Sequence, residues 1–263
     1  MSPIAHRNYL LDDYLADVSP WRVEKIVHVE AGQPVGSQLA ETDWLQALAN
    51  DTGYPHGVVA GADLLDPNLE TLLAAHAQRP NVRGVRQIVC WHSDPKKTYT
   101  DRDLISDPQW EAGLSRLADH DLSFDLQLYP GQMAKAAELA QRHPDVPLIV
   151  NHAGLPTDRD ESGMETWRAG LRGLAANPHV SIKISGLGIT DRSWSQESIR
   201  PIILECIEAF GVERAMFASD FPVESVHGSF DAFFSAFDAI TSDFSDDERE
   251  RLFAANAETI YRI

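Results

Sequence analysis

The chain has 263 residues, of which 43% are apolar and 24% charged, so it is long enough for one large domain over residues 1–263. Its formal net charge of −18 argues against binding to nucleic acid or to an anionic membrane, because both require clustered Lys and Arg. The only cysteines, Cys90 and Cys206, argue against a disulfide scaffold. Since we find no signal peptide and no apolar run of about 18 residues, we expect a cytoplasmic protein.

Seven short β-rich runs alternate with longer segments of helical period along most of the chain. The runs cover residues 23–31, 56–65, 82–90, 122–129, 147–153, 180–188 and 214–220. Apolar residues at three- and four-residue spacing predict helices over residues 43–51, 68–78, 108–120, 133–143, 164–177, 198–210, 230–240 and 246–263. This alternation is typical of repeated βα units that form a parallel sheet.

Two parallel architectures are compatible with these runs. A doubly wound sheet usually carries a Gly-rich phosphate loop after its first strand, and Gly32 and Gly36 do not supply that spacing. A (β/α)₈ barrel needs eight strands to close, one more than the runs that we count. We therefore predict an α/β protein with a (β/α)₈ TIM barrel whose first strand is missing from this chain or irregular.

Two strand ends carry side chains suited to catalysis. The last run, RAMFASD, stops at Asp220, and the run PLIVNHAG places His152 where another apolar strand ends. The carboxyl ends of parallel strands meet at one rim of a barrel, which is where α/β folds place their chemistry. Asp220 as a turn cap and His152 as a core residue are the structural alternatives, but their coincidence favours a shared catalytic site.

Three more polar side chains are candidates for binding the substrate. Polar and apolar residues alternate in LSFDLQLY and VSIKISGLG, which places Gln127 and Lys183 on the face that points into the barrel. Arg86, in the third run, offers a fixed cation. Structural roles are also open: Arg86 could form an ion pair with Asp125 or a neighbouring acid, and Lys183 could serve as a counter-ion to Asp220.

The order of several motifs resembles the amidohydrolase-related family of TIM-barrel hydrolases. This is the branch that includes lactonases for 2-pyrone-4,6-dicarboxylate and for sugar lactones such as fuconolactone. The motifs are VRGVRQI, DPQWEAGLSRLADHDLSFDLQLYP, DVPLIVNHAGLP, SIKISGLG, SDFPV and LFAANAETIYRI. The resemblance covers nearly the whole chain. It implies that Asp220 matches the family's strand-eight aspartate, His152 its strand-six histidine, and Arg86 an arginine that holds the substrate's carboxylate or carbonyl.

The start of the sequence departs from the family pattern. Members usually begin with a strand that carries D-x-H-x-H, whereas this sequence begins at what resembles the following loop, and we favour an upstream start over a trimmed barrel. As written, the chain offers only His152 and Asp220 as obvious metal ligands, and two ligands rarely hold zinc. We therefore expect no required cofactor, with a single divalent metal such as zinc as the alternative if first-strand ligands are supplied.

These residues predict a hydrolase that acts on a small carbonyl substrate, in the simplest case a lactone. Asp220 would accept a proton from the attacking water and return it to the leaving alkoxide, while His152 and Arg86 stabilise the oxyanion. The alternatives are a metal-dependent amidohydrolase or decarboxylase of the same superfamily, and a non-catalytic barrel that binds a metabolite. The expected partner is a small molecule, carboxylated or a lactone, and the sequence is compatible with a homo-oligomer.

Overall fold

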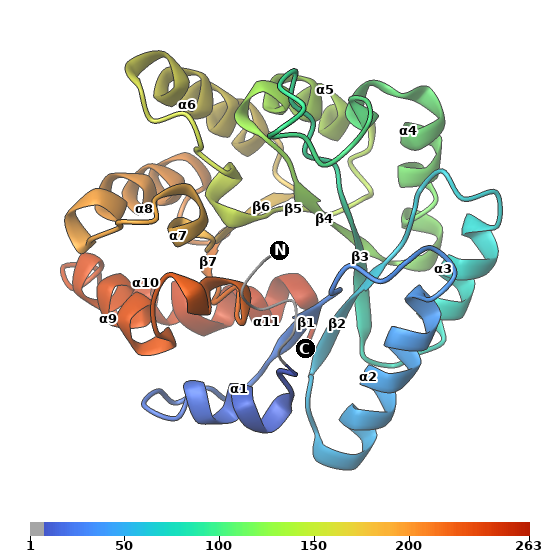
Figure 1. The fold of residues 1–263 in the computed structure, drawn as a ribbon, viewed down its shortest axis with the longest axis horizontal. Helices are drawn as coiled ribbons and strands as arrows, with labels where there is room; N and C mark the ends of the chain where they lie inside the picture. The colour runs from blue at the N-terminus through green and yellow to red at the C-terminus, as the bar shows by residue number, and fades with distance from the viewer. Residues whose placement is uncertain (1–7) are drawn as a thin grey trace.

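The fold is a curled parallel sheet with its helices on the outer side. The computed structural model describes residues 8–263, and the strands follow one another in the sheet in chain order (Figure 1). They are β1 (Val27–Val29), β2 (Gly57–Gly61), β3 (Val82–Ile88), β4 (Ser123–Gln127), β5 (Leu148–Val150), β6 (Val180–Ile184) and β7 (Ala215–Phe217). All six neighbouring pairs are parallel. The predicted α/β barrel fold is therefore confirmed, with seven strands among the described residues.

The helices alternate with the strands, mostly as predicted. They are α1 (Leu11–Asp17), α2 (Gln38–Thr52), α3 (Leu69–Ala77), α4 (Pro108–Ser115), α5 (Met133–Arg142), α6 (Glu161–Ala175), α7 (Leu187–Thr190), α8 (Gln196–Phe210), α9 (Phe230–Ile240), α10 (Asp246–Glu250) and α11 (Asn256–Tyr261). The segments Leu11–Asp17 and Leu187–Thr190 were not predicted to be helical, and a π-helical turn, Arg251–Ala255, divides the helix expected over residues 246–263. Side-chain caps fix several of their starts: Asp160, for example, accepts a hydrogen bond from the Gly163 amide at the start of α6. Among residues 8–263, no helix is long and apolar enough to cross a membrane.

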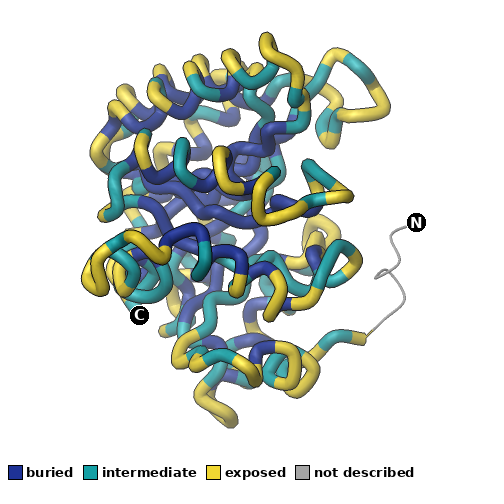
Figure 2. Tube along the Cα trace, turned by 90° about the vertical axis from the view of Figure 1, so that its left-hand side faces the viewer, coloured by how far each residue is buried: buried dark blue, intermediate teal, exposed yellow. Residues whose placement is uncertain are grey.

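The outward faces of the strands pack into one large apolar cluster, and apolar residues on the inward faces of some strands form a second, smaller cluster. Outward side chains such as Val85, Phe124 and Ile182 are buried against the helices in the larger core. A smaller cluster occupies the inside of the barrel and comprises Val59, Ile149, Met216 and Tyr261, with Val27, Val29, Ala257, Ile260 and Ile263 packed against it. Figure 2 shows the buried segments at the centre of the molecule and helices around them whose outer turns are exposed. The period of two in the sequence therefore distinguishes the helix-facing side from the barrel interior.

The C-terminal helix α11 lies between the first and last strands. Within the described chain β1 and β7 do not pair with each other, and α11 lies between them in Figure 1. Asn256 donates a hydrogen bond of 2.7 Å to the carbonyl oxygen of Ala215 in β7, while Glu258 pairs with Lys25 just before β1 at 2.8 Å. The helix thus covers apolar surface that two unpaired edge strands would otherwise expose.

The strands are shorter than the predicted runs, and this matters at their carboxyl ends. β5 ends at Val150 and β7 at Phe217, so His152 and Asp220 lie two and three residues beyond their strands. Both residues therefore belong to the loops at the carboxyl rim of the barrel, where TIM barrels carry their active sites.

Candidate active site

The structure brings His152 and Asp220 together. His152 Nδ1 lies 3.8 Å from Asp220 Oδ2 and 3.0 Å from the hydroxyl oxygen of Ser185, which follows β6. The His152 and Asp220 side chains retain 8% and 14% of their exposure, respectively. An imidazole and a carboxylate from loops 68 residues apart therefore meet at one nearly enclosed place at the rim.

His152 and Asp220 both have left-handed backbone conformations, which set the directions of their side chains. His152 has a φ of 53° and Asp220 a φ of 54°, both in the left-handed region, as are the neighbours Ala153 and Leu155. That region costs roughly 1–2 kcal/mol for a residue with a Cβ atom, and such strain is concentrated at functional sites. Gly186 makes the arrangement possible, since a Cβ atom there would lie 2.7 Å from the Cβ atom of His152.

The surroundings shift the two pKa values in opposite directions. Burial raises the pKa of Asp220 to about 7, helped by the nearby Glu224 carboxylate, while Arg86 and Lys183 act in the other direction. Burial lowers the pKa of His152 well below its usual range, and the same two cations lower it further. At neutral pH the imidazole is therefore neutral while the carboxyl group titrates, which is the protonation that a general base beside a neutral hydrogen-bond donor requires.

Asp220 Oδ2 is buried and, among the described residues, has no hydrogen-bond partner. An ionised oxygen in that position costs free energy unless something binds to it. The oxygen is therefore available to a water molecule or to a substrate.

Glu224, which we did not single out from the sequence, supports the Asp220 loop. Its two carboxylate oxygens accept hydrogen bonds from the amides of Gly188 (3.0 Å) and Ile189 (3.1 Å) in α7, and its side chain is buried. Burial raises the pKa of Glu224 to about 6, against the effect of those two bonds. Glu224 thus joins the loop after β7 to the turn after β6, and its carboxylate raises the pKa of Asp220.

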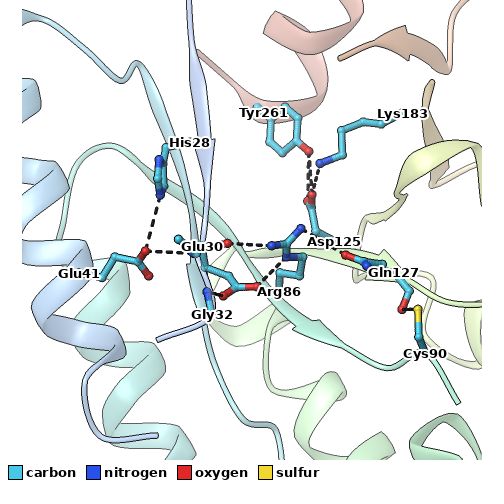
Figure 3. Close-up of polar contacts among 11 residues, drawn as sticks. His28, Glu30, Gly32, Glu41, Arg86, Cys90, Asp125, Gln127, Lys183 and Tyr261 are labelled. Carbon is cyan, nitrogen blue, oxygen red and sulfur yellow. Dashed lines mark hydrogen bonds and ion pairs between the residues drawn. The ribbon is translucent and has the colours of Figure 1, made fainter. Parts of the chain in front are cut away.

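Arg86 is held by Glu30, another residue to which we assigned no catalytic role. Arg86 Nε donates to Glu30 Oε1 at 2.7 Å and Nη2 donates to the Glu30 carbonyl oxygen at 2.7 Å, while Nη1 lies 3.4 Å from Gln127 Oε1 (Figure 3). The expected ion pair of Arg86 with an acid therefore exists, and its acid is Glu30 rather than Asp125. A guanidinium bound in this way presents a fixed N–H edge but little uncompensated charge.

Lys183 pairs with Asp125 and not with Asp220. The alternative that Lys183 is the counter-ion of Asp220 is therefore wrong. Lys183 Nζ lies 2.5 Å from Asp125 Oδ2, and the Tyr261 hydroxyl donates to the same carboxylate at 3.1 Å (Figure 3). Asp125 lies on β4, directly next to Arg86 on β3, and is completely enclosed. The pair forms because an ionised Asp125 at this depth requires a cation and donors around it.

The described residues do not form a complete metal site. In the part of the chain that the structure describes, no group of three or more His, Cys, Asp or Glu side chains is arranged to hold a metal ion. His152 and Asp220 would supply two ligands, and structural or catalytic zinc takes at least three from the protein.

Comparison with known proteins places the chain in a family. It matches the Amidohydrolase family model over residues 5–263. The chain belongs to the amidohydrolase family. The resemblance inferred from the sequence motifs is thereby confirmed, and the barrel and its rim loops can be compared with those of other amidohydrolases.

Several relatives resemble this amidohydrolase along most of its length. It is 45% identical to the protein y4mH of Sinorhizobium fredii, over 98% of this chain and 87% of that protein. It is 30% identical to an L-fucono-1,5-lactonase of Burkholderia multivorans, over 97% of this chain and 88% of the lactonase. A Burkholderia multivorans amidohydrolase crystallised with zinc superimposes with a TM-score of 0.86 at 27% identity, covering 99% of this chain and 90% of the other.

Proposed function

We propose that this amidohydrolase opens the ring of a lactone by hydrolysis, with Asp220 as the general base. The observation that carries the proposal is the contact of 3.8 Å between Asp220 and a neutral His152 at the rim of the barrel. Asp220 has a pKa of about 7, and one of its oxygens has no hydrogen-bond partner in the part of the chain that the structure describes, so it is suited to accept a proton from water at neutral pH. The 30% identity to an L-fucono-1,5-lactonase supports the choice of a lactone over other carbonyl substrates.

The proposed reaction balances with these groups alone. Asp220 takes a proton from water while the water oxygen bonds to the lactone carbonyl carbon, and the carbonyl oxygen becomes an oxyanion. His152 Nδ1 accepts a hydrogen bond from the Ser185 hydroxyl, so that the proton of the neutral imidazole lies on Nε2 and can be donated in a hydrogen bond to that oxyanion. The Nη1 edge of Arg86 can donate a hydrogen bond as well. The tetrahedral carbon then expels the ring oxygen, and Asp220 returns its proton to the leaving alkoxide to give an open hydroxy acid.

The arrangement of Arg86 bears on what this residue can bind. Its charge is balanced by Glu30, so we propose that it orients the lactone carbonyl instead of forming an ion pair with a substrate carboxylate. Gln127, the last residue of β4, accepts a hydrogen bond from Arg86 and would contact the same end of the substrate. Lys183 is assigned an indirect role, since its ammonium group is bound to Asp125.

A metal-dependent reaction is the second candidate, because a related amidohydrolase crystallised with zinc. His152 and Asp220 would be the ligands that this chain offers, and at least one further ligand would have to come from outside the described residues. We keep this candidate as an alternative outcome of the experiment below.

A screen of lactones, run with and without a chelator, tests the proposal. We expect ring opening, measured by proton release, to persist in chelator and kcat/KM to rise with pH through about 7 as Asp220 ionises. Replacement of Asp220 by Asn should abolish turnover while binding persists. Complete loss of activity in chelator, reversed by added zinc, would establish the metal-dependent alternative, and hydrolysis of no lactone would refute the proposal.

A further inference from the structure

Asn151 precedes His152 and is completely enclosed by the protein. Within residues 8–263, neither its amide nitrogen nor its amide oxygen has a hydrogen-bond partner. An enclosed amide without partners costs about 1–3 kcal/mol for each group left unsatisfied. A bound ligand that hydrogen-bonds to the amide would offset this cost.

The backbone directs the Asn151 side chain into the barrel. The backbone N–H of Asn151 donates a hydrogen bond to the Leu126 carbonyl oxygen at 3.0 Å. The φ of −88° and ψ of 151° at Asn151 are those of extended chain, so this residue continues β5 by one residue. Side chains two residues apart on a strand share a face, and Ile149 belongs to the inner cluster of the barrel. Asn151 therefore points to the same interior as Ile149, closer to the carboxyl rim.

The register places Asn151 among the residues of the candidate active site. In the sheet, Asp125 pairs with Ile149 and Ile149 pairs with Ser181. Two residues further along each strand, Asn151 therefore lies level with Gln127 at the end of β4 and with Lys183 on β6. Its chain neighbour His152 contacts Asp220. The free amide thus lies between the polar interior and the proposed base.

We infer that Asn151 contacts the substrate directly and recognises a hydroxyl group on the lactone ring, an inference that rests on the proposed function. A carbonyl or carboxylate oxygen can only accept, so it would satisfy the amide nitrogen alone. A hydroxyl group both donates and accepts, so hydroxyl groups on the ring can satisfy both ends of the amide. The neighbouring cations support the choice, since Arg86 and Lys183 are each bound to a buried carboxylate and offer little to a charged substituent.

Two lactones of the same ring size test this inference. D-Glucono-1,5-lactone and related aldono-1,5-lactones carry ring hydroxyl groups, and δ-valerolactone carries none. Asn151→Leu keeps the shape of the side chain and removes its polar atoms. We expect this variant to lose about 10- to 100-fold in kcat/KM for the best aldonolactone, the range for one or two lost hydrogen bonds, and to keep its activity on δ-valerolactone within about threefold. Equal losses on both lactones, or no loss on either, would overturn the inference.

Asn177 provides a matched control. It is also buried, but its amide nitrogen lies 3.2–3.4 Å from the carbonyl oxygens of Ala137, Gly173 and Leu174, so it has a structural role. Asn177→Leu should lower the midpoint of urea unfolding and leave the ratio of the two kcat/KM values unchanged.

The stability of Asn151→Leu separates failure of the inference from failure of the proposed function. An amide kept for a ligand makes no contribution to folding, so the leucine variant should unfold at the same or a higher urea concentration than the wild type. If the wild type opens no lactone, the proposed function fails, and a lower midpoint for Asn151→Leu would then show that the amide serves the fold. A midpoint at or above that of the wild type would still support a ligand-binding amide.

Discussion

Replacement of Asp220 by asparagine tests the electrostatic basis of the proposed mechanism without any substrate. Burial raises the pKa of Asp220 from 3.8 to about 7. A carboxyl group with a raised folded-state pKa stabilises the folded protein only while it is protonated, and this contribution disappears as the pH rises through the folded-state pKa. Above about pH 7 the ionised carboxylate therefore destabilises the fold, whereas an asparagine of the same shape does not.

The size of the effect follows from the pKa. One pKa unit corresponds to about 1.4 kcal/mol, so a rise from 3.8 to about 7 gives about 4 kcal/mol as an upper limit. Because the side chain keeps 14% exposure, we expect solvent to reduce this to about 2 kcal/mol. Asp220→Asn should therefore unfold with a free energy about 2 kcal/mol above that of the wild type at high pH, and with nearly the same free energy at low pH.

Urea unfolding at about pH 4.5 and about pH 8.5 measures this difference, since most of the interval between the unfolded-state pKa of 3.8 and the folded-state pKa of about 7 lies between the two conditions. The exposed Asp119 provides the control, because Asp119→Asn should change stability little and equally at both pH values. If the gain from Asp220→Asn is the same at both pH values, or if the variant is the less stable protein at about pH 8.5, the raised pKa is wrong, and with it the assignment of the base.

Three further substitutions test the supporting network. Lys183→Met should lower the free energy of unfolding by about 3–5 kcal/mol, because it leaves Asp125 buried without its cation, and urea titration would detect this. Tyr261→Phe removes a hydroxyl that donates to the same carboxylate and should cost about 1.5–3 kcal/mol in the same assay. Glu30→Gln should release the charge of Arg86, so that in competition assays the ratio of kcat/KM for carboxylated over neutral lactones rises about tenfold or more. An unchanged ratio would show that Arg86 does not reach the substrate.

The sequence contains enough information for the barrel and for the positions of His152 and Asp220. Short apolar runs at regular intervals specify parallel strands, and the carboxyl ends of such strands always meet at one rim. An acid and an imidazole at two of these ends must therefore lie on the same side of the molecule. The exact ends of the strands could not be predicted, because the apolar stretch RAMFA continues past Phe217, where the ladder stops.

The partners of the interior charges could not be predicted in the same way. Tyr261 reaches Asp125 across 136 residues of sequence, and Glu30 reaches Arg86 across 56. Periodicity indicates which face of a strand a residue occupies, but not which side chain it meets across the barrel. The side-chain amide of Asn151, which has no hydrogen-bond partner among residues 8–263, was also missed, since an asparagine beside a strand-end histidine is typical of an ordinary turn.

The interior ion pairs have a consequence for the proposed base. Arg86 and Lys183 both lower the pKa of Asp220, and unpaired cations at those positions would hold the carboxylate ionised and weakly basic. Glu30 and Asp125 each pair with one of these cations, and burial, together with Glu224, outweighs the two cations and raises the pKa of Asp220 to about 7.

The ion pair between Glu30 and Arg86 should also affect the rate of the reaction. Removal of the Glu30 charge should both free Arg86 and lower the pKa of Asp220, so the acidic limb of the kcat/KM profile of Glu30→Gln should move to lower pH. A purely structural role for Glu30 would lower stability and leave the position of that limb unchanged. A shift of the acidic limb to lower pH would therefore show that the Glu30–Arg86 ion pair sets the basicity of Asp220. An unchanged position would show that this pair has only a structural role.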